Sequence, residues 1–392
     1  MKTLITLLVA SLLLLSCSKE QPYIETIVDG VKIIENTKEG IKKDLTYKIQ
    51  HIMTVENSDE DTTFVLNFPQ HRADLNSDLD DKGNLYVVDN VKSFILKFDK
   101  NGKYLSQWGA KGQGPGEFPS SPIDISVVSS TNKVHVFDGS GRLSIFDLDG
   151  NFIKFYNISK RAVRAKNFYY TDQGPLFGCE VFEGQWGTND FKMGTCLYNG
   201  TSEYDIKDKI AGDTKPFDMK NVDADDQGLL TAISGENIYI ADTSKNKYVI
   251  YQYDYSGKRL KEIKKKYAPL RRSKEDMEGI QEALDKVEKN MGGMIEFKEV
   301  SNLRSAITQM FIDSKNNLWV TVNESMFKEE GQEFDVFNDQ GHFLKTVAVP
   351  ELAGFKIRAK GKYLIAATPI EQNYSEGGKA DVVIKVFELT MD

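Results

Sequence analysis

The sequence of 392 residues is poor in several features that define other classes of protein. It has three cysteines, four histidines and ten prolines, so it offers neither a zinc-binding motif nor a proline-rich linker. Acidic residues outnumber basic ones, 58 to 50, which argues against nucleic acid as a partner, because neutralising phosphates needs a basic surface. No apolar run after residue 15 approaches the length of a membrane span. What remains, with 40% hydrophobic residues, is typical of an ordered, acidic body.

The first twenty residues predict export and lipid attachment. A short basic start precedes the apolar run 4–15, which is typical of a secretory signal and too short for a relaxed membrane span. Leu14-Leu15-Ser16-Cys17 resembles the bacterial lipobox, in which the cysteine is acylated and becomes the mature N-terminus. The plain alternative is cleavage near residue 16 without a lipid. We therefore predict a signal peptide at 1–16, lipidation of Cys17, and an anchor and N-terminal segment at 17–46.

One short motif recurs along the rest of the chain. Each copy has an aromatic residue, then Asp or Asn, then a glycine three residues later, and the copies are Phe98–Gly102, Phe146–Gly150, Tyr253–Gly257 and Phe337–Gly341, with a degenerate one at Leu197–Gly200. Glycine adopts the positive φ that tight hairpin turns require, and Asp or Asn can bond the turn backbone. Three of the four intervals between the glycines match a propeller blade of roughly 40–50 residues, and the fourth needs an insertion.

Three apolar strands precede or enter each motif, so each unit reads as four antiparallel strands. The chain ends with only three strands, at 355–358, 363–367 and 382–389, while the strand 47–53 lies unmatched before the first unit. Pairing 47–53 with the last unit closes the ring and removes two open edges. We predict an all-β fold, a six-bladed β-propeller of four-stranded antiparallel blades over 47–392, with its last blade closed by an N-terminal strand. Seven blades is the alternative, if 21–46 contains further strands.

A glycine-rich connection carries a family resemblance. Gly112-Gln113-Gly114-Pro115-Gly116-Glu117-Phe118, ahead of Pro122-Ile123-Asp124-Ile125, is similar to the connection between blades of NHL-type β-propellers. Together with the lipobox and the repeated turns, the chain resembles the NHL-type six-bladed β-propeller lipoproteins of Bacteroidetes over about 70–392. The resemblance implies an architecture and leaves the chemistry open, since propellers support binding, scaffolding and catalysis alike.

Irregular segments are predicted to gather on one face. Strands alternate in direction, so the loops between second and third strands share a face with the connections between blades; we call it the loop-rich face. It receives the loops 183–190, 323–332 and 370–381, the connection 111–118 and a helical insertion at about 268–294. In the insertion, Ser273 begins a capping-box-like pattern and apolar residues follow at helical spacing. The helix either packs on the propeller rim, covers the channel mouth or docks a partner.

Several side chains on this face are candidate ligand-binding residues. Second strands end at Asp89, Asp138 and Asp242, with Asn323 in the corresponding place, and such a ring could hold Ca²⁺ or polarise a substrate; the alternative is that each residue bonds its own turn. Trp186, at a glycine-flanked loop tip, could stack on a sugar ring or anchor a partner, or pack against its own blade.

Two cysteines flank the loop that carries this tryptophan. Neighbouring strands could bring Cys179 and Cys196 within reach of a disulfide, and two buried free thiols are the alternative.

No serine elbow, metalloprotease motif or phosphate loop is present in the sequence. We predict an outer membrane lipoprotein, on the periplasmic side or the cell surface, that binds a glycan, peptide or envelope protein through its loop-rich face and needs no cofactor. The alternative is a metal-assisted hydrolase or lyase with its site at the channel mouth, holding Ca²⁺ or another divalent ion. Sequence spacing names no catalytic or metal-ligating residue for that alternative.

Overall fold

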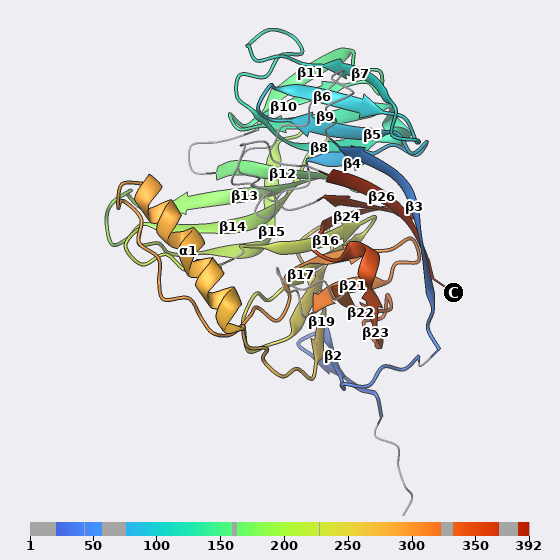
Figure 1. Cartoon of the computed structure of the whole chain (residues 1–392), viewed down its shortest axis with the longest axis vertical. Helices are drawn as coiled ribbons and strands as arrows, with labels where there is room; N and C mark the ends of the chain where they lie inside the picture. The colour runs from blue at the N-terminus through green and yellow to red at the C-terminus, as the bar shows by residue number, and fades with distance from the viewer. Residues whose placement is uncertain are drawn as a thin grey trace, which may run out of the picture.

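A computed structural model of the chain describes residues 21–42, 44–56, 76–158, 163–226, 228–322, 332–367 and 383–391 (Figure 1). The described strands form six sheets, five of four strands and one of six. Each sheet contains a blade of four strands that follow one another outward from a central channel, and within these four every neighbouring pair is antiparallel. The predicted six-bladed β-propeller is therefore confirmed, and the seven-bladed alternative is wrong.

The blades follow the chain in order. Blade 1 contains β4 (Ser77–Leu79), β5 (Leu85–Asp89), β6 (Phe94–Phe98) and β7 (Tyr104–Trp108). Blade 2 contains β8 (Pro122–Val128), β9 (Lys133–Asp138), β10 (Arg142–Phe146) and β11 (Phe152–Asn157). Blade 3 contains β12 (Val163–Thr171), β13 (Gly174–Glu183), β14 (Lys192–Gly200) and β15 (Ile206–Pro216). A short 3₁₀ turn follows β8 at Ser129–Thr131, and another lies at Pro350–Leu352.

The second half of the ring holds the helix. Blade 4 contains β16 (Leu230–Ser234), β17 (Asn237–Ala241), β18 (Val249–Tyr253) and β19 (Arg259–Lys265). The insertion follows with α1 (Lys274–Asn290), and then blade 5 contains β20 (Met310–Ile312), β21 (Leu318–Val322), β22 (Gln332–Phe337) and β23 (Phe343–Val349). Blade 6 contains β24 (Lys356–Lys360), β25 (Tyr363–Ala367), β26 (Val383–Met391) and β3 (Tyr47–Glu56).

The ring closes where the sequence predicts. β3 pairs antiparallel with β26, and Met53 lies opposite Val386. Both side chains are buried in one cluster with residues of blade 1, so the closing strand also packs on the next blade. This pairing covers the outer edge of β26 and gives the last blade its fourth strand.

Two strands that the sequence did not predict extend blade 4. β1 (Tyr23–Val28) and β2 (Val31–Asn36) form a hairpin, here called the N-terminal hairpin, and β2 pairs in parallel with β19. The Asn36 side chain fixes this pairing, because its amide donates to the carbonyls of Lys264 and Gly341 at 3.0 Å and its oxygen accepts from the Phe343 N–H at 2.8 Å. Residues 21–46 thus contain strands, but these widen a blade instead of adding one.

The repeated motif forms near-identical turns between the third and fourth strands. In blade 1 the Asp99 carboxylate accepts the N–H groups of Asn101 and Lys103 at 2.8 and 3.0 Å, and Gly102 has φ 83°. The same two bonds recur at Asp147, Asp254 and Asn338. The degenerate copy does not make this turn, because its glycine lies inside β14.

Adjacent blades are joined by packing and by polar contacts between their innermost strands. The carboxylate of Asp78 accepts the N–H of Val127 in the next blade at 2.7 Å. Asp124 and Gln309 bond the following innermost strands in the same way, at 2.8 and 2.7 Å. These bonds satisfy backbone donors that would otherwise face the channel, and they hold its wall in register.

The part of the chain that the structure describes contains no helix long and apolar enough to span a membrane.

Candidate functional site

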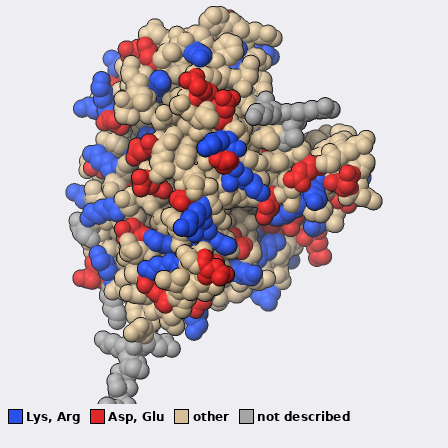
Figure 2. Space-filling model, turned by 180° about the vertical axis from the view of Figure 1, so that it is seen from behind, with Lys and Arg blue, Asp and Glu red and all other residues tan. Residues whose placement is uncertain are grey.

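A cavity of about 1510 Å³ runs along the channel and opens on the loop-rich face. All six innermost strands contribute to its wall, including Asp78, Phe168, Thr231, Phe311 and Arg358. Its mouth is formed by the connection between β15 and β16, the loop after β17 and the insertion between β19 and β20. Seen from behind in Figure 2, the surface is hollowed near the centre of the view, with basic and acidic side chains around the hollow.

The insertion stands at this mouth. Asp276 and Ile280 of α1 line the cavity, and the apolar stripe of the helix is only half-buried. The predicted start of the helix is confirmed, since the Ser273 hydroxyl accepts the Asp276 N–H at 3.0 Å and the Asp276 carboxylate accepts the Ser273 N–H at 3.2 Å. Arg304 also pairs with Asp276, so the first turn of the helix is tied to the chain that returns to blade 5.

A second ion-pair cluster ties the insertion to blade 4. The Arg272 guanidinium bonds the Asp225 carboxylate at 2.5 and 3.3 Å, and Lys245 bonds the same carboxylate at 2.6 Å. Burial alone would raise the pKa of Asp225, but the hydrogen bonds from Arg272 and Lys245 outweigh burial and lower it. The mouth is therefore held by charged groups that are already paired.

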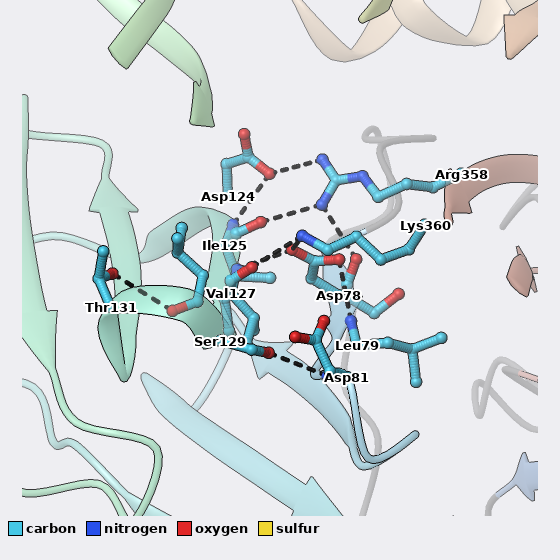
Figure 3. A network of polar contacts seen from close by, with 12 residues as sticks. Asp78, Leu79, Asp81, Asp124, Ile125, Val127, Ser129, Thr131, Arg358 and Lys360 are labelled. Atoms are coloured by element: carbon cyan, nitrogen blue, oxygen red, sulfur yellow. Dashed lines mark hydrogen bonds and ion pairs between the residues drawn. The ribbon is translucent and has the colours of Figure 1, made fainter. Parts of the chain in front are cut away.

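Deeper in the channel, charged side chains of blades 1, 2 and 6 meet in what we call the channel network (Figure 3). Arg358 of β24 donates to the Asp124 carboxylate at 2.9 Å and to the carbonyls of Ser77 and Ile125 at 3.0 Å. Lys360 donates to Asp78 at 3.1 Å. Burial raises the pKa of Asp124, and the nearby guanidinium opposes that rise.

The sequence reasoning missed the channel network. Its members are Asp78, Asp124, Arg358 and Lys360, which are far apart in the chain but all lie in or at the end of innermost strands. The available signal was the presence of charged residues in strands that otherwise read as apolar. Such residues in a buried strand need partners, and the ring brings those partners together.

The predicted ring of Asp89, Asp138, Asp242 and Asn323 is brought together only in part. Only Asp242 lines the cavity among the three that the structure describes, and it accepts the Ser244 N–H at 2.9 Å; Asn323 lies outside the described residues.

The other two carboxylates bond their own loops. Asp89 accepts the N–H groups of Val91 and Lys92, and Asp138 accepts those of Ser140 and Arg142. Burial raises the pKa of Asp138, and the Ser140 hydroxyl opposes this rise. In the described ranges, no group of three or more His, Cys, Asp or Glu side chains is arranged to hold a metal ion.

Trp186 lies on the loop-rich face with 61% of its surface exposed. Its ring meets that of Phe191 edge to face at 4.9 Å, and Phe217 lies beside it at 6.5 Å. Phe217 also lines the cavity, so the exposed indole continues the cavity rim outward along blade 3. The glycines on either side, Gly184 and Gly187, both have positive φ and give the loop its sharp bends.

Cys179 on β13 and Cys196 on β14 lie directly opposite each other. Cys179 and Cys196 are buried free thiols in the structure. Burial raises the pKa of the Cys179 thiol to about 12, and the neighbouring Cys196 adds to this rise. The predicted disulfide stays a prediction, and Cys17 lies outside the described residues.

The closed ring with one helical insertion defines the class, a six-bladed β-propeller. Residues 78–366 match the model of the DUF5128 family, described as a 6-bladed beta-propeller, and the chain belongs to this family. The finer assignment to NHL-type lipoproteins stays a prediction from the sequence.

Comparison with solved structures finds similar chains at low sequence identity. A duf4221 family member from Bacteroides vulgatus is 13% identical with a TM-score of 0.50, over 90% of this chain and 100% of that one. A Bacteroides fragilis protein described as a candidate exported protein is 14% identical with a TM-score of 0.49, over 92% and 99%. No curated protein matches the chain in sequence. The likeness to the Bacteroides vulgatus structure concerns the fold alone and carries no chemistry to this chain.

Proposed function

We propose that this protein is a membrane-anchored extracytoplasmic binding protein whose ligand enters the channel cavity from the loop-rich face. The observation that carries this proposal is the cavity itself, about 1510 Å³ in volume with its mouth between the insertion and the connections of blades 3 and 4. Pockets for drug-sized ligands measure roughly 300–1,000 Å³. The larger volume suits a segment of a glycan or peptide, or a loop of an envelope protein, better than a small metabolite.

The lining chemistry supports recognition of such a ligand. Aromatic side chains contribute to the wall and mouth, among them Tyr169, Tyr170, Phe217, Tyr251 and Tyr253. Aromatic faces pack on sugar rings and on apolar side chains, while hydroxyls and charges fix orientation. Trp186 adds an exposed platform at the rim, and acylation of Cys17 would hold the propeller at the outer membrane, on the periplasmic side or the cell surface.

The metal-assisted hydrolase or lyase has no supporting observation among the described residues, and we do not propose it.

A binding screen with matched variants tests the proposal. The full-length acylated protein in nanodiscs is screened against arrays of bacterial surface glycans and of peptides, and the strongest ligand is titrated by calorimetry. We expect Trp186→Ala and Ile280→Ala each to weaken binding about tenfold, because one removes the rim platform and the other part of the cavity wall. Ile153→Ala, an exposed apolar side chain on β11, is the control and should leave binding unchanged. Unchanged affinity in both site variants would contradict the proposal.

A further inference from the structure

The N-terminal hairpin exposes an unusual amount of apolar surface. In β1, Ile24 is 58% exposed, Ile27 78% and Val28 50%. Ile27 is the most exposed large apolar side chain in the described part of the chain. All three belong to one six-residue strand, with Ile24 and Val28 on one of its faces and Ile27 on the other, so apolar side chains are exposed on both sides of this edge strand. We call this apolar surface around β1 the patch, and exposed apolar surface of this kind marks contact sites.

The patch lies on the outermost strand of the six-stranded sheet of blade 4. Edge strands usually carry charges or prolines that prevent unwanted contacts, whereas β1 carries only one charged side chain, Glu25. Among the described residues, no strand pairs with the outer edge of β1. The exposed edge is therefore suited to contact with something other than the propeller itself.

The hairpin is held firmly in this position. The Glu25 carboxylate bonds Lys32 at 2.8 Å on the neighbouring strand and His342 at 2.6 Å on blade 5. Tyr23 stacks on the His342 ring with centroids 3.9 Å apart. On the other strand, Ile34 is fully buried between blades 4 and 5. The apolar exposure of β1 thus belongs to an anchored element and not to a fraying chain end.

The position of Cys17 in the sequence indicates what lies near this patch. Tyr23 follows Cys17 by only six residues, which span at most about 20 Å when fully extended. An acyl chain on Cys17 sits in a lipid layer, so the start of β1 is held within that distance of the lipid headgroups. No other described element is tethered so closely to the lipid.

We propose that the N-terminal hairpin lies against the lipid surface in which Cys17 is anchored, with β1 facing the lipid. The proposal rests on the acylation that is part of the proposed function. The outer edge of blade 4 then faces the membrane. In Figure 1, β2 lies at the bottom and α1 at the left of the molecule, so a lipid surface against the hairpin would lie to one side of the helix that stands at the cavity mouth.

Quenching by spin-labelled lipids tests this contact. Ile27→Cys and the control Ile153→Cys are each made in the full-length acylated protein, labelled with an environment-sensitive fluorophore and placed in phosphatidylethanolamine and phosphatidylglycerol vesicles that contain doxyl lipids. Ile153 is 52% exposed on the outer strand of blade 2, and the buried Cys179 and Cys196 do not compete for the label. We expect at least twofold stronger quenching at position 27 than at position 153. Equal quenching at both positions would overturn the proposal.

Two controls separate the other outcomes. First, the measurement is repeated at a tenfold lower protein density. If β1 pairs with a second copy of the chain, the fluorescence spectrum will change with protein density and the doxyl lipids will not quench it. That result would also overturn the proposal. Mass spectrometry of the N-terminal peptide checks the lipid on Cys17. A missing lipid overturns the hairpin contact together with the anchoring, whereas equal quenching with the lipid present overturns the contact alone and leaves ligand binding untouched.

Discussion

The two faces of the propeller are built from opposite kinds of sequence. On the face that carries the turns between third and fourth strands, the turn face, Asp99, Asp147, Asp254 and Asn338 make the same two bonds to their own backbones. On the loop-rich face the connections differ: one loop presents the exposed Trp186, and another contains α1. The carboxylate and amide groups of the repeated turns bond their own backbones, while the connection between β15 and β16, the loop after β17 and the insertion form the mouth of a cavity.

This difference shows where a ligand can be recognised. A side chain that satisfies its own turn stabilises the fold and has little capacity left for a partner. Asp89 and Asp138 have that role even on the loop-rich face, which is why a repeated carboxylate is a poor guide to a binding site. The loop-rich face should therefore affect binding more than stability, and the channel network and the turn face should do the reverse.

The largest expected effect on stability comes from the channel network. Arg358→Met leaves the buried Asp124 carboxylate without its cation and two carbonyls without a donor, so we expect the free energy of unfolding to fall by about 3 kcal/mol. Lys166→Met is the matched control, because Lys166 also lines the cavity but its ion pair with Glu180 is more exposed, and its loss should cost less than about 1 kcal/mol. Urea denaturation measures both, and equal losses would contradict the distinction.

Acidification should also act through the buried interior. Burial lowers the pKa of His135 to about 3, whereas in the unfolded chain its pKa is about 6.5. Between these two pH values, His135 is protonated in the unfolded state and neutral in the folded state. The contribution of His135 to the free energy of unfolding is therefore fully present above about pH 6.5. It falls by about 1.4 kcal/mol for each pH unit as the pH drops towards 3.

The variant His135→Gln isolates this effect. Glutamine does not titrate and can still bond the Tyr204 hydroxyl, which the histidine ring contacts at 2.9 Å. Denaturation at a series of pH values should give a shallower pH dependence for His135→Gln than for the unmodified protein. Identical slopes between pH 6 and pH 4 would show that the ring is not held neutral.

Local sequence signals were enough to predict the ring. Gly102 and Gly150 could be recognised as turn residues from the few residues around them. The place of the strand 47–53 followed from the need to pair an otherwise open edge of the last blade. The start of α1 was predictable for the same reason, since the capping pattern at Ser273 is local. These features report on the backbone within a few residues.

The cavity and the hairpin required the folded chain. Asp78, Asp124 and Arg358 meet only because blades 1, 2 and 6 converge, and nothing in their separate segments specifies the pairing. Similarly, the parallel pairing of β2 with β19 joins segments more than 200 residues apart. Contacts of this kind depend on the topology of the folded chain. The sequence therefore indicated on which face the site lies, but not which residues line it.

A smaller effect is expected on the turn face. Asp147→Ala removes the acceptor for the N–H groups of Asp149 and Asn151, and we expect a loss of about 1 kcal/mol in the free energy of unfolding. Asp147→Asn should be nearly neutral, because Asn338 already makes the equivalent two bonds in blade 5. Neither variant should change ligand affinity. Guanidinium denaturation measures the free energy of unfolding, and calorimetry measures the ligand affinity. A loss of affinity in either variant would show that the turn face takes part in binding, which would contradict the difference between the two faces.

The smallest expected effect on stability belongs to the residue with a large expected effect on binding. Trp186 is 61% exposed and rests on Phe191, so Trp186→Ala should change the free energy of unfolding by about 0.5 kcal/mol or less. Its affinity for the ligand should nevertheless fall, since an exposed aromatic ring at a rim contributes mainly after a partner covers it. Trp186→Phe keeps an aromatic surface and should recover part of the binding. A destabilisation as large as that of Arg358→Met would mean that the indole supports its blade, and the contrast between the two faces would then fail at this loop.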